Sequence, residues 1–361
     1  MRSIASRVAL AALLSLPLGT LAQTTPDKNS ATELIAEGVK LYDTGRYEAA
    51  VFRYQQALAL QPNNVVAKAE LAMTLHQLGK YEEAVSQCRE ALALPGKSGP
   101  NLYATYANSL DALQRSEEAE QVYKQGLEHY PNYFLLLYNL GVTQHSLHKT
   151  QEAQRSFQQA VQANPGHASS NLSWGLSMLD QGNRIPAILA LSQFLLLEPN
   201  SKRSAENLAR LHTLMQQGIE QKEGGATVLS ISTEQVEAAK KPKKGSKQGA
   251  DNFASKEMML TLLGVVNELP PELASNPVEV YNFRFDLFCQ QLLPSKGATG
   301  LAWTHYAPFF SEMQKKGHTK AFSYVIHMQD SEQAYARDWL KEHSAEVDAL
   351  YAWANAYKWP K

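Results

Sequence analysis

The chain has 361 residues, of which 44% are hydrophobic and 19% are charged, and its formal net charge at pH 7 is −1. This composition is typical of soluble globular proteins, and the length allows more than one domain. A net charge so close to zero excludes a global attraction to nucleic acid or to anionic lipid, so we expect no nucleic-acid partner.

Residues 1–22 are predicted to be a cleavable signal peptide. Arg2 and Arg7 give a positive start, and residues 8–18 form an apolar run that is too short to span a bilayer. A small-residue cleavage site ends at Ala22, and no cysteine follows it for a lipid anchor. The pattern favours bacterial export to the periplasm, with no transmembrane segment after cleavage; an uncleaved anchor or a cytosolic start is the alternative. Residues 23–30 are expected to be a flexible leader.

Residues 31–201 repeat with a period of about 34 residues. Each copy contains two helical stretches joined by a turn. In the first copy Gly38 and Ala57 are small where helices approach closely, Tyr47 and Tyr54 fill a wedge, and Pro62 follows a helix end. Later copies place comparable residues at the same offsets: Leu71, Gly79, Tyr81, Ala84, Ala91, Ala107, Ala119, Tyr123, Pro131, Leu140, Gly141, Ala153, Phe157, Ala160, Pro165, Trp174, Gly175, Gly182, Ala187 and Pro199.

On these positions the segment resembles the tetratricopeptide-repeat superfamily, over about half of the chain. The resemblance implies an all-α solenoid of helical hairpins, with a concave face that holds a peptide or a partner helix. It does not imply one activity, because a fold does not fix a function. Residues 203–217 continue the helical pattern and are expected to cap the last repeat, so that the array covers residues 31–217.

The concave face is expected to come mainly from the first helix of each copy. Two offsets in that helix supply our candidate partner-binding residues: Glu70, Met73, Thr105, Asn108, Asn139, Ser173, Asn207 and Arg210. Asn108 and Asn139 should be neighbours, and each can give a donor and an acceptor to a peptide backbone. Some members of the superfamily clamp a C-terminal carboxylate with asparagines and cations. The matching cation positions here hold Ala104, Ser169 and Ser173, so we predict no such clamp. The alternative is that the asparagines are solvated and hold no ligand.

The chain has two cysteines, Cys88 and Cys289. In an oxidising compartment they could form a disulfide. Cys88, however, occupies a repeat offset that holds Tyr54, Tyr123 and Phe157 in other copies, which indicates a core position. We therefore favour two buried thiols, with a disulfide as the alternative.

Residues 218–252 are expected to be a flexible linker. Gly224-Gly225 interrupts regular structure, and Lys240–Lys247 is a basic run that also contains proline and glycine. We interpret the run as a solvated spacer, and a contact for an anionic polymer, a lipid headgroup or nucleic acid is the alternative. No aromatic residue lies among these lysines, so base stacking is unsupported.

Residues 253–361 are expected to form a smaller, mostly helical domain that could fold alone. Asn276 and Pro277 are typical of a helix start, and an apolar stripe follows them. Further helices are expected over 308–316 and 319–328, and from Ser331 and Ser344 onward. The aromatic residues predicted for its core are Tyr281, Phe285, Trp339, Tyr351 and Trp353. An exposed patch of Trp353 and Trp359 is the alternative.

The sequence contains no motif of an enzyme or a cofactor site, so we predict no catalytic residue, no cofactor and no metal. The late histidines, together with Cys289, lack the spacing of a helical zinc site: His305, His318, His327 and His343. His76 and His145 lie a whole repeat or more apart and are expected at the surface. A cluster assembled only in three dimensions is the alternative.

The sequence therefore predicts an exported, non-catalytic scaffold or adaptor that binds a protein or peptide partner. One alternative is an enzyme whose active site lies in residues 253–361 and whose repeats recruit the substrate. Another is an envelope assembly factor that uses the lysine run. The sequence does not determine the partner or the oligomeric state.

Overall fold

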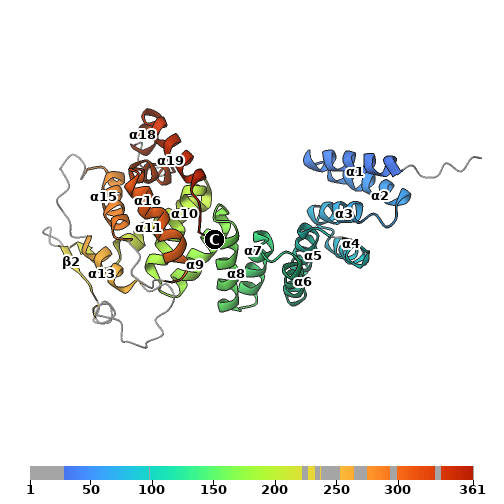
Figure 1. Ribbon diagram of the computed structural model, residues 1–361, viewed down its shortest axis with the longest axis horizontal. Coiled ribbons are helices and arrows are strands. Elements are labelled where there is room, and N and C mark those ends of the chain that lie inside the picture. Colours follow the sequence, from blue (N-terminus) through green and yellow to red (C-terminus); the bar gives the residue numbers. More distant parts are fainter. Residues whose placement is uncertain are drawn as a thin grey trace, which may run out of the picture. The chain divides into compact units, whose positions relative to one another are not determined.

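The computed structural model describes residues 28–96, 98–221, 227–231, 236, 253–263, 275–292, 299–329 and 335–360. The chain divides into two compact units, residues 1–98 and 99–361. The expected signal peptide and the lysine run lie outside the described residues. The described part is helical apart from one short β-hairpin, as expected for an all-α fold (Figure 1). None of its helices combines the length and apolarity that crossing a membrane requires.

The first unit consists of two helical hairpins, α1 with α2 and α3 with α4. Their bounds are α1 Lys28–Asp43, α2 Tyr47–Leu60, α3 Val65–Gln77 and α4 Tyr81–Ala93. Helix α1 therefore starts inside the segment expected to be a flexible leader. The pairing of small and large residues is confirmed, because Tyr54 is fully buried and a Cβ atom on Gly38 would lie 2.4 Å from its ring.

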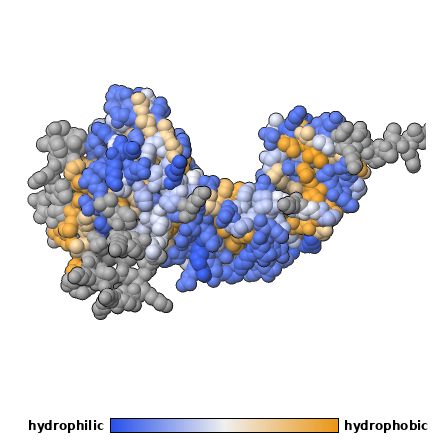
Figure 2. Space-filling model, viewed as in Figure 1, coloured by the Kyte–Doolittle hydropathy of each residue, from blue (hydrophilic) through white to orange (hydrophobic). Residues whose placement is uncertain are grey.

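The second unit begins with three further hairpins and a single helix. These are α5 Pro100–Ala112, α6 Ser116–His129, α7 Phe134–Ser146, α8 Thr150–Ala163, α9 Ala168–Asp180, α10 Arg184–Leu197 and α11 Lys202–Gln216. Each odd-numbered helix from α5 to α9 packs on the helix that follows it. The second helices α6 and α8 are rich in polar residues, and the surface over them is hydrophilic (Figure 2). The predicted array of helical hairpins is thus confirmed in this unit from α5 to α11.

The close approach of α7 and α8 depends on Gly141. A Cβ atom at this position would lie 2.6 Å from the ring of Phe157, which is buried. We expect Gly141→Ala to lower the free energy of unfolding by about 1–3 kcal/mol, because overpacking outweighs the better helix propensity of alanine. The measurement is urea unfolding followed by circular dichroism, with Ser146→Ala at the exposed end of α7 as the control. Equal stability of Gly141→Ala and the wild type would contradict this account of the repeat contact.

Helix α10 differs from the other second helices because residues 184–196 are all buried. Its sequence, RIPAILALSQFLLL, is apolar on every side, and a helix of that kind must be covered all round. Helices α9 and α11 pack on it, and so do elements from the C-terminal part of the chain (Figure 1). We expected a C-terminal domain able to fold alone, whereas the structure gives these late helices and the last repeat one shared core.

The C-terminal part contains β1 Ile219–Gln221, β2 Thr227–Leu229, α13 Ala254–Leu263, α15 Pro277–Gln290, the π-helix η1 Ala302–Tyr306, α16 Ala307–Lys315, α17 Thr319–Ile326, α18 Tyr335–Glu342 and α19 Ser344–Ala356. The predicted start of α15 is confirmed, because the Asn276 side chain accepts a hydrogen bond from the Val278 amide at 3.0 Å. Four predicted helices correspond to α16, α17, α18 and α19, although the expected start of α18 at Ser331 lies outside the described residues. The predicted apolar stripe of α15 is buried: Val278, Tyr281, Phe285, Phe288 and Leu292.

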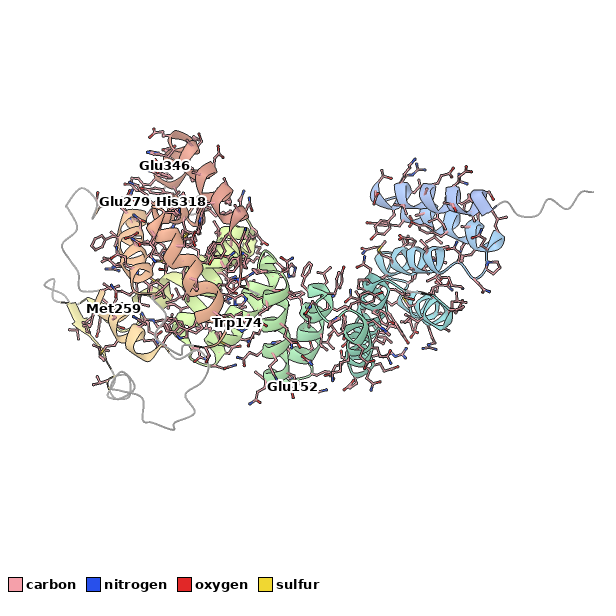
Figure 3. All side chains as sticks on the ribbon, viewed as in Figure 1. Glu152, Trp174, Met259, Glu279, His318 and Glu346 are labelled. Carbon is pink, nitrogen blue, oxygen red and sulfur yellow. The ribbon has the colours of Figure 1, made fainter. Side chains whose placement is uncertain are left out.

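The π-helix η1 was not predicted, and it connects the C-terminal part to α9. The ring of Tyr306 stacks on Trp174 of α9, which is labelled in Figure 3, with centroids 5.5 Å apart. The Tyr306 hydroxyl donates a hydrogen bond of 2.6 Å to Asn171. Trp303 stacks on Phe253 with centroids 3.9 Å apart. Trp359 also packs against this region, so the structure does not support an exposed tryptophan patch near the end of the chain.

Two features at the beginning of the expected linker are structured. Strands β1 and β2 pair antiparallel, with Ile219 opposite Leu229. Gly218, which has a φ of +83°, makes the turn into the hairpin after α11. Three-residue strands leave too short an alternation to be found in the sequence. The rest of the linker prediction is not tested by the described residues.

The side chain of Arg184 joins three elements from inside the second unit. Its Nε donates to the Leu214 carbonyl oxygen at 2.8 Å, and one Nη donates to the Thr261 hydroxyl at 3.0 Å. Burial lowers the pKa of Arg184 to about 10, although the nearby Glu257 opposes this. This buried arginine therefore fixes α10 to the end of α11 and to α13.

Both cysteines are free and buried, which confirms the prediction of two buried thiols. Cys88 lies in the core of the first unit and Cys289 in the core of the second. Burial raises the pKa of the Cys88 thiol to about 12, and burial likewise raises that of Cys289. Because the thiolate is the reactive form, neither cysteine is a candidate nucleophile.

Candidate functional site

The best-ordered polar arrangement among the predicted site residues is a pair of asparagines on α5 and α7. The Nδ2 of Asn139 donates to the Oδ1 of Asn108 at 3.1 Å, so the two residues are neighbours, as expected. The hydroxyl of the buried Tyr123, on α6, donates to the same oxygen of Asn108. These contacts fix the orientation of both side-chain amides.

The fixed orientation determines what the pair can offer to a ligand. The Oδ1 of Asn108 already accepts two hydrogen bonds, so its Nδ2 group is its remaining donor. The Nδ2 of Asn139 is the donor in the contact between them, and its Oδ1 remains as an acceptor. Both side chains are half-buried. One donor beside one acceptor matches the C=O and N–H groups of an extended peptide.

The other side chains near the two asparagines are apolar or form hydrogen bonds within the protein. Val142 follows Asn139 by one turn of α7 and is 42% exposed. The hydroxyl of Thr143 donates to the Asp111 carboxylate at 2.5 Å, which is a further link between α7 and α5. We call the surface formed by Asn108, Asn139 and Val142 the asparagine face. Its amide and apolar groups suit an uncharged peptide segment more than a charged one.

The remaining predicted site residues are less available. Thr105 and Asn207 are buried, and the Nδ2 of Asn207 donates to the Arg203 carbonyl oxygen of its own helix at 2.7 Å. Arg210 forms an ion pair of 2.6 Å with Glu206, so its charge is already partly compensated. Ser173 is half-buried on α9.

Glu70 and Met73 belong to the first unit and lie half-buried on α3. Burial, followed by the nearby Asp43, raises the pKa of the Glu70 carboxyl group. A carboxyl group of this kind holds its negative charge less readily than a solvated one, and that does not favour a role in binding a cationic partner.

The pKa of Glu120, on α6, lies far from its usual value, and the packing of the helices explains this shift. Glu120 is buried and accepts hydrogen bonds from Lys149 at 2.5 Å and from Gln144 at 3.2 Å, and Lys124 lies 2.8 Å away. Burial alone would raise the pKa of Glu120, but these donors outweigh it and lower the value to about 2. The network links α6 to α7 and to the start of α8, so we assign it to the packing of neighbouring repeats.

The late histidines that could have formed a metal cluster do not come together. One of them, His327, contacts a histidine that the sequence did not indicate. The Nε2 atoms of His327, directly after α17, and His212 on α11 lie 2.8 Å apart. His305, His318 and His343 each contact other residues, separately from this pair and from one another. In the described part of the chain, no group of three or more His, Cys, Asp or Glu side chains could hold a metal ion. Only the helical spacing of α11 could have indicated that His212 faces inward.

The tautomers of this histidine pair follow from its neighbours. The Nδ1 of His327 lies 2.6 Å from the Ser323 carbonyl oxygen, and a carbonyl oxygen can only accept, so this nitrogen carries the proton. The Nε2 of neutral His327 is then the acceptor, and His212 donates. Burial, followed by the charge of His212, lowers the pKa of His327 to about 4. His327 is therefore neutral at pH 7, and its hydrogen bond with His212 joins α11 to the end of α17.

Comparison with known proteins agrees with the repeat pattern. Residues 41–107 and residues 122–155 match two family models, each described as a tetratricopeptide repeat. No curated protein matches the chain.

Several solved structures are similar to part of the chain. The protein pilF of Pseudomonas aeruginosa has 21% identity and a TM-score of 0.44, over 52% of this chain and 90% of that one. YrrB, a TPR protein with an unusual peptide-binding site, has 21% identity and a TM-score of 0.40, over 51% and 93%. The first TPR of Spaghetti (RPAP3), bound to an HSP90 peptide, has 30% identity and a TM-score of 0.32, over 34% and 95%.

Proposed function

We propose that this chain, whose residues 41–107 and 122–155 belong to the tetratricopeptide-repeat superfamily, is an exported, non-catalytic adaptor that holds an extended segment of a partner protein on its asparagine face. The observation that carries the proposal is the fixed donor and acceptor that Asn108 and Asn139 leave available. Repeat arrays of this family serve as scaffolds for protein interactions, and the rigid packing of α5 to α7 positions the two amides in advance.

The geometry supports recognition of the partner's backbone rather than of its charges. A donor and an acceptor side by side pair with one peptide unit of an extended segment. The exposed Val142 offers an apolar contact one helical turn away. The cations at the end of the array, Arg203 and Arg210, are each engaged by a glutamate. A neutral, extended segment with a small apolar residue is the ligand that fits these groups best.

The test starts from the partner, which is captured from periplasmic extract with the tagged protein and identified by mass spectrometry. The affinity of its bound segment is then measured by fluorescence polarisation. We expect Asn139→Ala to weaken binding about fivefold, because the loss of one peptide hydrogen bond costs about 1 kcal/mol. The double variant Asn139→Ala with Val142→Ser should weaken it further.

Asn132→Ala is the matched control, because Asn132 is exposed in the turn between α6 and α7. This variant should bind as tightly as the wild type. Asn139→Ala leaves the bond between Tyr123 and Asn108 in place, so its fold should be intact by circular dichroism. An unchanged affinity of the folded double variant would place the binding site elsewhere.

Export is supported by the charge and apolar pattern of residues 1–22. The test is the N-terminal sequence of the protein recovered from the periplasmic fraction of a bacterial host. A mature chain that starts at Gln23 is the expected result. Recovery of the intact chain from the cytosol would contradict the proposal.

A further inference from the structure

A cavity of about 250 Å³ lies between α11 and α15 in the second unit and is separate from the asparagine face. The residues that line it are His212, Met215, Gln216, Ser275, Pro277, Val280, Tyr281 and Arg284. Most of these side chains are apolar or aromatic, and one carries a permanent positive charge. Small-molecule sites in proteins have this composition, with apolar walls and a few polar groups that orient the ligand.

The charged group of the cavity is Arg284, which no carboxylate neutralises within the described part of the chain. The side chain is half-buried, and its Nε atom is buried without a hydrogen-bond partner. Burial also lowers the pKa of the guanidinium group. A partly buried cation that lacks a counterion costs free energy, and an anion bound in the cavity would recover it.

The part of the cavity wall formed by His212 and Tyr281 is held in place by contacts with His327. His212 is fixed by its hydrogen bond to the buried His327, which is itself bonded to the Ser323 carbonyl oxygen. The ring of Tyr281 lies 5.6 Å from the ring of His212 and 4.9 Å from that of His327, measured between centroids. Helices α11, α15 and α17 thus form a pre-organised wall, which reduces the entropic cost of binding.

We propose that this cavity binds a small monocarboxylate with a short apolar tail. The carboxylate pairs with the guanidinium of Arg284, which can offer two parallel N–H donors. The tail lies against Met215, Val280 and the ring of Tyr281. A cavity of about 250 Å³ has room for an acid of about eight to ten non-hydrogen atoms. A single arginine among apolar walls favours a carboxylate over a phosphate dianion.

The test is isothermal titration of the full-length protein with hexanoate and octanoate, and with hexanamide as the neutral analogue. We expect saturable binding of the acids and binding of hexanamide that is at least tenfold weaker. Arg284→Gln should weaken the binding of the acids at least tenfold. Arg337→Gln removes an exposed arginine on α18 outside the cavity and should leave the affinity unchanged.

A second variant keeps the test decisive if Arg284→Gln does not fold. Val280→Phe should fill the cavity from its half-buried edge and abolish binding of the longer acid first. The proposal is overturned if neither acid binds the wild type saturably. It is also overturned if hexanamide binds as well as hexanoate, or if a folded Arg284→Gln variant keeps the affinity of the wild type.

Discussion

Trp174→Ala is expected to lower the free energy of unfolding of the second unit by about 3–5 kcal/mol, the range for removal of a large aromatic side chain from a core. Trp174 is fully buried on α9, and its ring stacks on Tyr306 of η1. Tyr306 is also tied to α9 through the hydroxyl that donates to Asn171. The variant therefore leaves a cavity at the point where the last repeat meets the C-terminal helices.

The measurement is urea unfolding combined with hydrogen exchange of individual helices. Because the core is shared, amide protection in α16 should fall together with protection in α9. Phe52→Ala is the control, since this side chain is 57% exposed on α2 of the first unit. The free energy of unfolding of Phe52→Ala should differ from that of the wild type by less than about 0.5 kcal/mol. Full protection of α16 in Trp174→Ala would mean that the late helices fold independently.

Acidification from pH 6.5 to pH 4 is expected to remove about 3 kcal/mol of stability through His327 alone. Its pKa is about 4 in the folded protein, chiefly because the ring is buried, whereas a solvated histidine titrates near 6.5. Within this window the unfolded chain binds a proton that the folded protein does not. The stability that His327 contributes is therefore complete above about pH 6.5. It is lost as the pH falls from there to the pKa of about 4 that His327 has in the folded protein.

Other wholly or partly buried histidines titrate in the same direction, so the measured quantity is the difference between variants. Burial lowers the pKa of His76, His167, His305 and His318 as well. We expect the stability gap between the wild type and His327→Gln to shrink by about 3 kcal/mol between pH 7 and pH 4. His145→Gln, at an exposed position on α7, should keep the pH dependence of the wild type. A gap that stays constant with pH would show that folding does not change the pKa of His327.

Much of the repeat region could be predicted because its signals are local. The contact between Gly38 and Tyr54 lies within one hairpin and recurs as Gly141 with Phe157. A fixed spacing on two helices is enough to bring such residues together. The same regularity places Asn108 beside Asn139, because equal offsets in successive first helices are neighbours. The Asn276 cap is local in the same sense.

The C-terminal part depends on contacts that no local spacing encodes. His212 and His327 are 115 positions apart in the chain, and Tyr306 and Asn171 are 135 positions apart. Each pair forms only when the part of the chain that follows α11 folds back on α10. The sequence shows that α10 is apolar on every side and so requires a cover, but it does not show what covers it.

The sequence by itself determined the helical hairpins, their period and the asparagine pair, because each follows from side chains a fixed and short distance apart along the helices. Only the tertiary structure decided that the C-terminal helices share the core of the last repeat, and that Arg284 and His212 face one cavity. The physical reason is that burial drives apolar surfaces together without specifying which surfaces meet. That choice depends on the shapes of both partners, and these shapes exist only in the folded chain.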